Sequence, residues 1–381
     1  MERNNLMMKK IKPLAFYLPQ YHPVPENDEW WGKGFTEWTN VGKAQPLFEG
    51  HEQPIYPGDL GYYDLRVPEV REQQAQMAKD YGVHGFIYYH YWFGNGKQLL
   101  ERVANDVLQS GKPDFPFCFC WANETWSGIW HGLSEKILAK QVYPNEQDLI
   151  AHFEYLLPFF KDERYIKIDN KPLFIIYDSN HLNEGDPHYI TKFRELARKN
   201  GFDDLYIMAS NKLRDDLDFK SMGYDSKISN AFQKAWIPHI AKKEYISHSQ
   251  YYKNRIKGLI GIKKKEQPKV GIQDAQAVVN DLKFEESNIP TYPCILPNWD
   301  NTPRSGYRGI ILANNSPELF EKQVEKAVEY LEDKKEYPEQ FLIIKSWNEW
   351  AEGNILEPDR KHGFGYLNAL KKILNKHSRN E

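Results

Sequence analysis

The chain has 381 residues, of which 41% are hydrophobic and 27% are charged, and its formal net charge is −3. The near balance of 50 Lys and Arg against 53 Asp and Glu argues against a broadly basic nucleic-acid-binding protein and against a disordered chain. Aromatic residues make up 14% of the chain, with 11 Trp, 24 Tyr and 20 Phe. Aromatic rings suit both a dense core and the faces of sugar rings, so composition alone leaves both interpretations open.

Cysteine usage and the N-terminal sequence predict a cytoplasmic protein. The three cysteines, Cys118, Cys120 and Cys294, are too few for a disulfide framework, so we expect reduced thiols in the core. Residues 1–12 are polar and basic and contain no apolar segment of the kind that an export signal requires. No run of about 18 apolar residues occurs, which argues against a membrane-spanning helix.

Short apolar runs bounded by Pro, Gly or charged residues recur along the chain and predict buried strands. Most of them are followed by a segment with apolar residues at three- and four-residue spacing, which predicts an amphipathic helix. The eight predicted strands are 13–21, 85–92, 116–122, 171–178, 205–211, 224–229, 291–299 and 341–347, and the predicted helices are 67–81, 98–110, 146–160, 189–200 and 317–331.

Strands that alternate with helices predict a parallel sheet, and eight such units predict an α/β fold closed into a (β/α)8 TIM barrel. We expect a single catalytic domain over residues 11–377. An open, doubly wound sheet is the alternative. It loses support because no G-x-G-x-x-G follows the first strand and residues 94–97 are too short for a phosphate-binding loop.

Two regions interrupt the alternation. Residues 21–63 are rich in Trp, Pro and Gly and predict a long irregular loop after the first strand, of the kind that is usually functional. Residues 231–288 form an insertion near strands 6 and 7, with a basic stretch at 253–269. That stretch is typical of a solvated loop, and contact with an anionic glycan or a membrane surface is the alternative.

The C-terminal ends of the strands form the active-site face of such a barrel. Ten of the 11 tryptophans fall near these ends or in the loop after the first strand, mixed with Asn, Asp, Glu and His, and Trp236 is the exception. This mixture is typical of sugar recognition, although core packing alone remains an alternative. The predicted substrate-binding residues are Tyr17, Gln20, Tyr21, His22, Trp38, Tyr88, His90, Trp92, Trp121, Asn123, Glu124, Trp126, Asp178, Trp299, Asp300, Asn348 and Trp350.

Two carboxylates, Glu349 and Glu352, lie three residues apart directly after the last predicted strand. If the chain enters a helical turn there, both side chains share one face and can border one substrate. Glycoside hydrolysis needs such a pair, and the flanking Trp347 and Trp350 would raise the proton affinity of the carboxylate that they desolvate. We therefore predict a catalytic pair, with two solvated loop glutamates as the alternative.

Other polar residues allow more than one interpretation. Glu124 could bind sugar hydroxyls or act as the partner of a glutamate after the last strand, and Asp178 and Asp300 could bind hydroxyls or cap the following helices. We expect neither a metal nor an organic cofactor, and the histidines show no metal-ligand spacing. The absence of a G-x-S-x-G motif argues against a nucleophilic serine triad. The single D-x-D, at 216–218, is more typical of a solvated acidic loop than of a nucleotide-sugar site.

Five motifs distributed along the chain are distinctive. They are F-Y-L-P-Q-Y-H-P at 16–23, E-W-W-G-K-G-F-T-E-W-T-N-V at 29–41, Y-Y-H-Y-W-F at 88–93, C-W-A-N-E at 120–124 and W-N-E-W-A-E-G at 347–353. Together they resemble the WbsX family, and the resemblance extends over nearly the whole chain. Members of this family are often labelled glycosyltransferases or lipopolysaccharide biosynthesis proteins, and they are also described as resembling glycoside hydrolase family 99.

The resemblance to family 99 implies a retaining endo-α-mannosidase or mannanase on a (β/α)8 barrel. By position, Glu349 would deprotonate the sugar's own 2-hydroxyl, which attacks C1, and Glu352 would act as general acid and then as base. The sequence has Ala351 where family 99 commonly has His, which affects the subsite contacts. We therefore expect an α-glycan hydrolase acting on an oligosaccharide or polysaccharide. The alternatives are a glycosyltransferase of lipopolysaccharide, O-antigen or other surface-polysaccharide synthesis, and a non-catalytic glycan-binding barrel.

Overall fold

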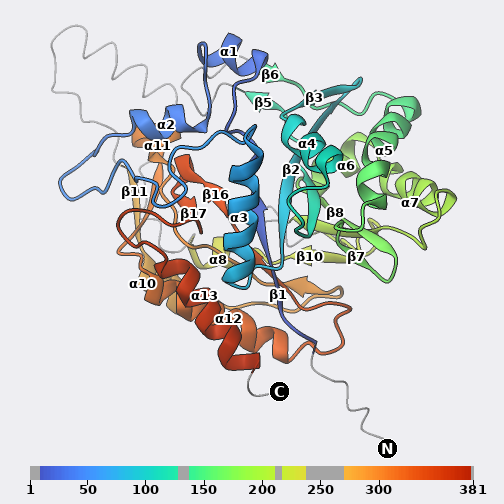
Figure 1. The fold of residues 1–381 in the computed structure, drawn as a ribbon. Helices are drawn as coiled ribbons and strands as arrows, with labels where there is room; N and C mark the ends of the chain where they lie inside the picture. Colours follow the sequence, from blue (N-terminus) through green and yellow to red (C-terminus); the bar gives the residue numbers. More distant parts are fainter. Residues whose placement is uncertain (1–8, 128–136, 211–216, 237–269, 379–381) are drawn as a thin grey trace, which may run out of the picture.

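The computed structural model of the chain describes residues 9–127, 137–210, 217–236 and 270–378. A curved sheet of parallel strands occupies its centre, and helices surround the sheet (Figure 1). The order of neighbouring strands is β12-β10-β9-β8-β4-β2-β1-β15-β13. The strands are β1 (Lys12–Tyr17), β2 (Gly85–Gly94), β4 (Phe117–Trp121), β8 (Lys171–Ile176), β9 (Tyr206–Ser210), β10 (Ser226–Ile228), β12 (Thr291–Tyr292), β13 (Cys294–Ile295) and β15 (Phe341–Ile344).

The two ends of this strand order meet. β12 and β13 are separated only by Pro293, yet β12 pairs with β10 and β13 pairs with β15. The first and last strands are therefore pieces of one short stretch of chain, and the sheet curls into a nearly closed barrel. This arrangement confirms the predicted TIM-barrel fold class, and each of the eight predicted strands overlaps an observed one.

The strands are continuous apolar runs because parallel barrel strands are covered on both faces. All ten residues of β2 are buried, and β1 pairs with β2 on one side and with β15 on the other, so that Ala15 lies opposite Phe86 and Ile344. Cys118, Cys120 and Cys294 are buried free thiols on these strands.

The five predicted helices are present, and a sixth long helix at the C-terminus was not predicted. Ser316 and Asn145 cap two of them by accepting hydrogen bonds from the backbone N–H groups of Leu319 and Asp148. The C-terminal helix packs beside the helix that precedes β15 (Figure 1). The long helices are α3 (Pro68–Asp80), α4 (Arg102–Ser110), α5 (Glu146–Lys161), α7 (Tyr189–Lys199), α12 (Pro317–Glu332) and α13 (Gly365–Ser378).

The predicted irregular loop 21–63 contains two short helices, α1 (Pro25–Trp31) and α2 (Glu37–Lys43), which corrects that expectation. Pro25 starts α1, and Thr36 forms a capping box with Thr39 at the start of α2. These local signals stabilise helices that are too short for periodicity to reveal. The predicted helix 98–110 is also shorter than expected, because β3 (Lys97–Leu99) pairs antiparallel with β2 before α4 begins.

Short strands and helices lie in the connections between the barrel strands and the long helices. The helices α8 and α10 contribute Phe232, Trp236 and Val278 to a second small hydrophobic core. The predicted basic stretch 253–269 lies outside the described residues. These elements are β5 (Trp126–Ser127), β6 (Ile137–Ala139), β7 (Lys167–Ile168), α6 (Ser179–Gly185), α8 (Ala231–Trp236), β11 (Gly271–Asp274), α10 (Ala275–Asp281), α11 (Thr302–Ser305), η3 (Gly306–Arg308), β14 (Ile310–Ala313), β16 (Asn348–Glu349), η4 (Trp350–Glu352) and β17 (Asn354–Ile355).

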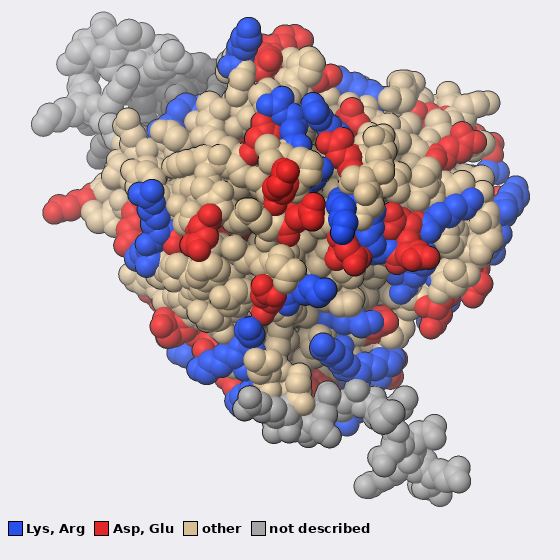
Figure 2. All heavy atoms as spheres, viewed as in Figure 1, with Lys and Arg blue, Asp and Glu red and all other residues tan. Residues whose placement is uncertain are grey.

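Acidic and basic side chains are interspersed over the described part of the face shown in Figure 2, as the small net charge suggests. Within the ranges that the structure describes, no helix combines the length and the apolar character needed to cross a membrane.

Candidate active site

The turn that follows β15, residues 348–355, carries both predicted catalytic carboxylates and is named the catalytic turn after that prediction. β16 and β17 pair antiparallel, with Glu349 opposite Asn354, and η4 connects them. The tight 3₁₀ geometry of η4 brings residues three apart onto the same side, so Glu349 and Glu352 lie together. Gly353 ends η4 with a φ of 59°, and a Cβ atom there would lie 2.9 Å from the backbone nitrogen of Asp300. Only glycine fits this position.

Glu349 is buried and weakly solvated. Its residue is 5% exposed, and its Oε2 atom receives no hydrogen bond from a donor group of the described residues. Burial and the neighbouring carboxyl of Glu352 raise the pKa of Glu349 well above its usual range, although Lys345 and Arg304 oppose the shift. Glu349 therefore holds a proton more tightly than Glu352 does.

Glu352 is ion-paired with Arg304 of α11. The Nη1 atom of Arg304 donates to Oε1 of Glu352 at 2.6 Å, and its Nε donates to Oε1 of Glu37 at 2.9 Å. Burial works against ionisation of Glu352, but the charge of Arg304 outweighs it, together with the hydrogen bond of Glu349, the charge of Lys345 and the hydrogen bond of Arg304, and the pKa of Glu352 is lowered. Arg304 thus keeps Glu352 ionised in the free protein.

Three elements that are distant in sequence bring this ion pair together. α2 supplies Glu37, α11 supplies Arg304, and both helices pack against η4 (Figure 1). Neither Glu37 nor Arg304 was predicted as a site residue. Glu37 lies inside the W-W-G-K-G-F-T-E-W motif, which could have pointed to it, whereas no local pattern marks Arg304.

Lys345 lies at the end of β15, beside the catalytic turn, and was not predicted either. Its Nζ atom lies 5.6 Å from the ring centroid of Tyr177, which follows β8. Burial disfavours the ammonium, but Tyr177, Glu349 and Glu352 outweigh burial and raise the pKa of Lys345 above its ordinary value. Lys345 is therefore a cation near the two carboxylates.

Another buried carboxyl, that of Glu357, holds the turn in place through hydrogen bonds. Its Oε2 accepts hydrogen bonds from the indole of Trp350 at 2.6 Å and from the hydroxyl of Tyr63 at 2.9 Å, and its Oε1 accepts one from Gln74 at 2.7 Å. Burial raises the pKa of Glu357 to about 7, against the effect of these hydrogen bonds. The network ties the catalytic turn to α3 and to the segment after β1.

Several predicted substrate-binding residues anchor the catalytic turn from inside the protein. Asn348 is fully buried, and it accepts from the backbone N–H of Leu18 at 2.7 Å and donates to the carbonyl of Leu18 at 3.1 Å. Tyr21 donates to the carbonyl of Asn348, and Tyr17 donates to Gln74. Their polar atoms are thus engaged by protein groups, as is the indole nitrogen of Trp350.

Other predicted substrate-binding residues lie within the barrel wall. His90 contacts His152 through the two Nε2 atoms at 2.8 Å, and burial lowers the pKa of His90 to about 3. Trp92 donates to Asp148, Trp121 donates to the carbonyl of Trp92, and Tyr88 packs in the core. His22 is buried as well, and burial lowers its pKa.

The predicted amide and aspartate ligands bond to neighbouring protein groups. The side-chain amide of Asn123 accepts a hydrogen bond from the backbone N–H of Asp178 and donates one to its carbonyl. Asp178 in turn caps α6. Asp300 accepts hydrogen bonds from His51 at 2.8 Å, Gln53 at 2.7 Å and Thr302 at 2.6 Å. Burial opposes ionisation of Asp300, but these hydrogen bonds prevail and lower its pKa.

The remaining predicted rim residues are partly exposed: Gln20, Trp38, Glu124, Trp126 and Trp299. Trp38 packs against Trp350, with ring centroids 5.4 Å apart, so aromatic side chains continue from the catalytic turn toward the surface. These residues are the parts of the predicted rim that a ligand can reach.

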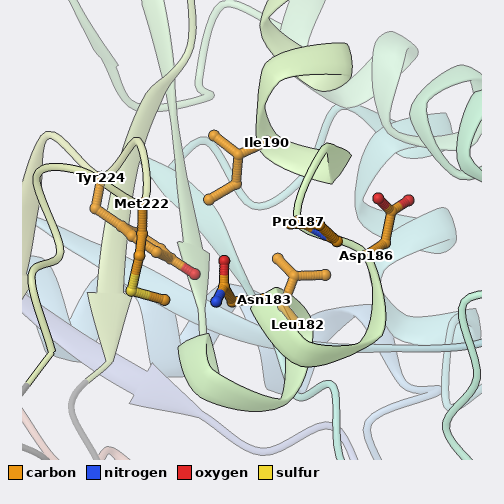
Figure 3. Close-up of a pocket in the computed structure, with 7 residues that line it drawn as sticks. All are labelled: Leu182, Asn183, Asp186, Pro187, Ile190, Met222 and Tyr224. Atoms are coloured by element: carbon orange, nitrogen blue, oxygen red, sulfur yellow. The ribbon is translucent and has the colours of Figure 1, made fainter.

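No cluster of three or more His, Cys, Asp or Glu within the described residues could hold a metal ion. A cavity of about 10 Å³ between α6, the start of α7 and the segment before β10 has room for about one water molecule (Figure 3). It is lined by Leu182, Asn183, Asp186, Pro187, Ile190, Met222 and Tyr224, away from the catalytic turn.

Comparison with solved structures shows barrels of the same fold. The GH99 endo-alpha-mannosidase from Bacteroides thetaiotaomicron, in complex with bis-tris propane, matches 97% of this chain and 97% of its own, with a TM-score of 0.56 and 14% identity. A glycoside hydrolase-like protein matches 98% of this chain and 96% of its own, with a TM-score of 0.57 and 15% identity. At these identities the likeness establishes the fold alone.

Sequence comparison establishes the family. Two strains of Xanthomonas campestris pv. campestris have a protein described as "uncharacterized protein WxcX" that is 32% identical over 364 residues, or 95% of this chain and 49% of theirs. This chain thus spans about half the length of the curated relatives it matches. The family described as glycosyltransferase WbsX matches residues 13–370. The chain therefore belongs to the WbsX family.

Proposed function

We propose that this protein cleaves an α-linked glycan with retention of configuration, using Glu349 and Glu352 as the catalytic pair. The observation that carries the proposal is the buried turn itself. It holds two neighbouring carboxyls at the C-terminal end of a barrel and gives them opposite shifts in pKa. One group is thereby suited to hold a proton while the other is ionised, as glycosidic bond cleavage requires.

The proposed reaction uses the 2-hydroxyl of the substrate as the nucleophile. Ionised Glu349 takes the proton of that hydroxyl, the oxygen attacks C1, and the C1–oxygen bond to the leaving group breaks as protonated Glu352 donates its proton to the leaving oxygen. Ionised Glu352 then takes a proton from water, which attacks C1 and opens the 1,2-anhydro sugar. The 2-oxygen recovers its proton from Glu349, and the site returns to its initial state.

The reaction starts from ionised Glu349 and protonated Glu352, but the free protein has the opposite arrangement. The raised pKa of Glu349 keeps the proton there, and Arg304 keeps Glu352 ionised. The two carboxyls act on each other directly, so a single proton can move between them. The proposal therefore includes a proton shift from Glu349 to Glu352 when substrate binds and excludes water from the turn.

The partly exposed Gln20, Trp38, Glu124, Trp126 and Trp299 are proposed to contact the glycan. α-Mannosides are the first substrates to test, because a solved structure with this fold is an endo-alpha-mannosidase. Transfer to a lipopolysaccharide or another surface polysaccharide is the second candidate, and the family's description as a glycosyltransferase favours it.

A panel of α-linked oligosaccharides, with and without sugar nucleotides, tests the proposal. Hydrolysis without a donor, with the α-anomer of the product formed first by NMR, is the expected result. We expect Glu349→Gln and Glu352→Gln each to lower kcat by about 100-fold or more. Glu124→Gln tests the other candidate carboxylate, and the control is Glu286→Gln, which alters an exposed carboxylate outside the turn.

Turnover that requires a sugar nucleotide and survives Glu352→Gln would establish transfer by another route. Glycan binding with full activity in both turn variants would remove the catalytic assignment, and binding without any turnover would indicate a non-catalytic barrel. Loss of activity in Glu124→Gln equal to that of the turn variants would make Glu124 a catalytic partner.

A further inference from the structure

Lys345 places an ammonium group directly after β15, at the C-terminal end of the barrel. It acts electrostatically on Cys120 of β4 and on Cys294 of β13, and its Nζ lies near the ring of Tyr177 after β8. Among the described residues, Nζ forms neither a hydrogen bond nor an ion pair.

Glu349 presents the complementary group to the same space. Its Oε2 atom is buried and receives no hydrogen bond from any donor in the part of the chain that the structure describes. Lys345 and Glu349 act on each other electrostatically, but they do not form an ion pair. Buried polar groups are normally hydrogen-bonded, so the unused Oε2 of Glu349, next to a cation that acts on it electrostatically, indicates a missing ligand.

A hydroxyl group satisfies both residues at once, because it donates its proton to a carboxylate and accepts a hydrogen bond from an ammonium. An anionic group fits less well. Arg304 keeps Glu352 of the turn ionised, and that carboxylate would repel a further negative charge.

We propose that Lys345 and Glu349 together bind one hydroxyl of the substrate sugar. Lys345 stabilises the negative charge that develops on that oxygen as Glu349 removes its proton. The inference rests on the proposed function and deepens it, since it identifies this hydroxyl as the one that attacks C1. A fixed cation in a water-poor site stabilises such a charge more strongly than solvent does.

Calorimetric binding of matched sugar analogues tests the inference without any turnover. The neutral probes are 1,5-anhydroglucitol and 1,5-anhydromannitol, and the cationic probes are 1-deoxynojirimycin and 1-deoxymannojirimycin, which carry the same hydroxyls and a ring ammonium. In Lys345→Met, we expect the preferred neutral probe to bind about 10- to 100-fold more weakly, because a charge-assisted hydrogen bond is lost. The cationic probe keeps its affinity or gains, because a repelling cation has been removed.

Two variants serve as controls. Lys371→Met removes an ammonium that lies 5.2 Å from the ring of Tyr81, away from the turn, and we expect it to bind both probes as the wild type does. Lys345→Arg keeps the charge and should retain most of the neutral-probe affinity. If the Met variant does not fold, Lys345→Gln, which also removes the charge, replaces it as the test.

Equal binding of the neutral probes by wild type and Lys345→Met would overturn the proposal, and so would failure of the wild type to bind either neutral probe. Binding of glucuronate that disappears in Lys345→Met, with neutral binding unchanged, would reassign Lys345 to an anion site. If the expected binding pattern holds but no glycan is cleaved, the proposed function fails while the hydroxyl site stands.

Discussion

Replacing Arg304 with Met tests whether one guanidinium sets the ionisation of the catalytic turn. Arg304 bonds to Glu352 at 2.6 Å and to Glu37, which is 1% exposed. Burial already raises the pKa of Glu37, and Arg304 opposes that shift. Without the guanidinium, we expect the pKa of both carboxyls to rise.

The stability cost follows from the burial of these groups. Removing one partner of a buried ion pair costs about 3–5 kcal/mol, because the remaining charge is uncompensated. Protonation of Glu37 limits that cost to its lost hydrogen bonds, about 1–3 kcal/mol. When the pKa of a carboxyl is higher in the folded state than in the unfolded state, the folded protein loses stability as pH rises from the unfolded-state pKa to the folded-state pKa. The deficit of Arg304→Met should therefore be larger at about pH 8 than at about pH 5.

Urea unfolding at the two pH values measures this deficit. The double variant Arg304→Met/Glu37→Gln should recover part of the loss at the higher pH, since it removes the uncompensated charge. Arg308→Met is the matched control, because Arg308 is exposed on the neighbouring η3. A deficit that does not change with pH, together with a further loss in the double variant, would refute the electrostatic explanation.

Three further predictions concern the turn and its support. Glu349→Gln should be more stable than the wild type at about pH 8, as thermal unfolding would show, because it removes a buried carboxyl whose pKa is raised by burial and by Glu352; a loss of stability would contradict this. Glu357→Gln should flatten the decline of stability between about pH 5 and pH 8 by about 3 kcal/mol, since the pKa of Glu357 is raised to about 7, whereas the exposed Glu286→Gln should leave that decline unchanged. Asn348→Leu should cost about 3 kcal/mol in urea unfolding, because it leaves the buried N–H and C=O of Leu18 unpaired, and a cost below about 1 kcal/mol would mean that water replaces the amide.

The strands could be predicted because parallel barrel strands are buried on both faces and read as uninterrupted apolar runs, as β2 shows. The short helices α1 and α2 could not be predicted from periodicity, because each spans only seven residues and depends on its terminal signals. The spacing of Glu349 and Glu352 predicted their proximity, because a single tight turn connects them.

The partners of these carboxylates could not be predicted in the same way. Arg304 and Glu37 are 267 residues apart, and only the packing of α2 and α11 on η4 brings them together. The position of a residue at the C-terminal end of a strand also did not predict whether its side chain is buried in the protein or exposed to a ligand. Asn348 and Trp121 lie at such ends, but both are fully buried and bond to neighbouring protein groups.

The ion pair gives the segment after β1 a role beyond shaping a rim. Glu37 begins α2 and holds Arg304, and Arg304 in turn lowers the pKa of Glu352. A change in the W-W-G-K-G-F-T-E-W motif that moved α2 would therefore alter the protonation of a carboxyl that is far away in sequence. We infer that this motif acts on the proposed chemistry through charge, because its glutamate is coupled to the catalytic turn by a single guanidinium.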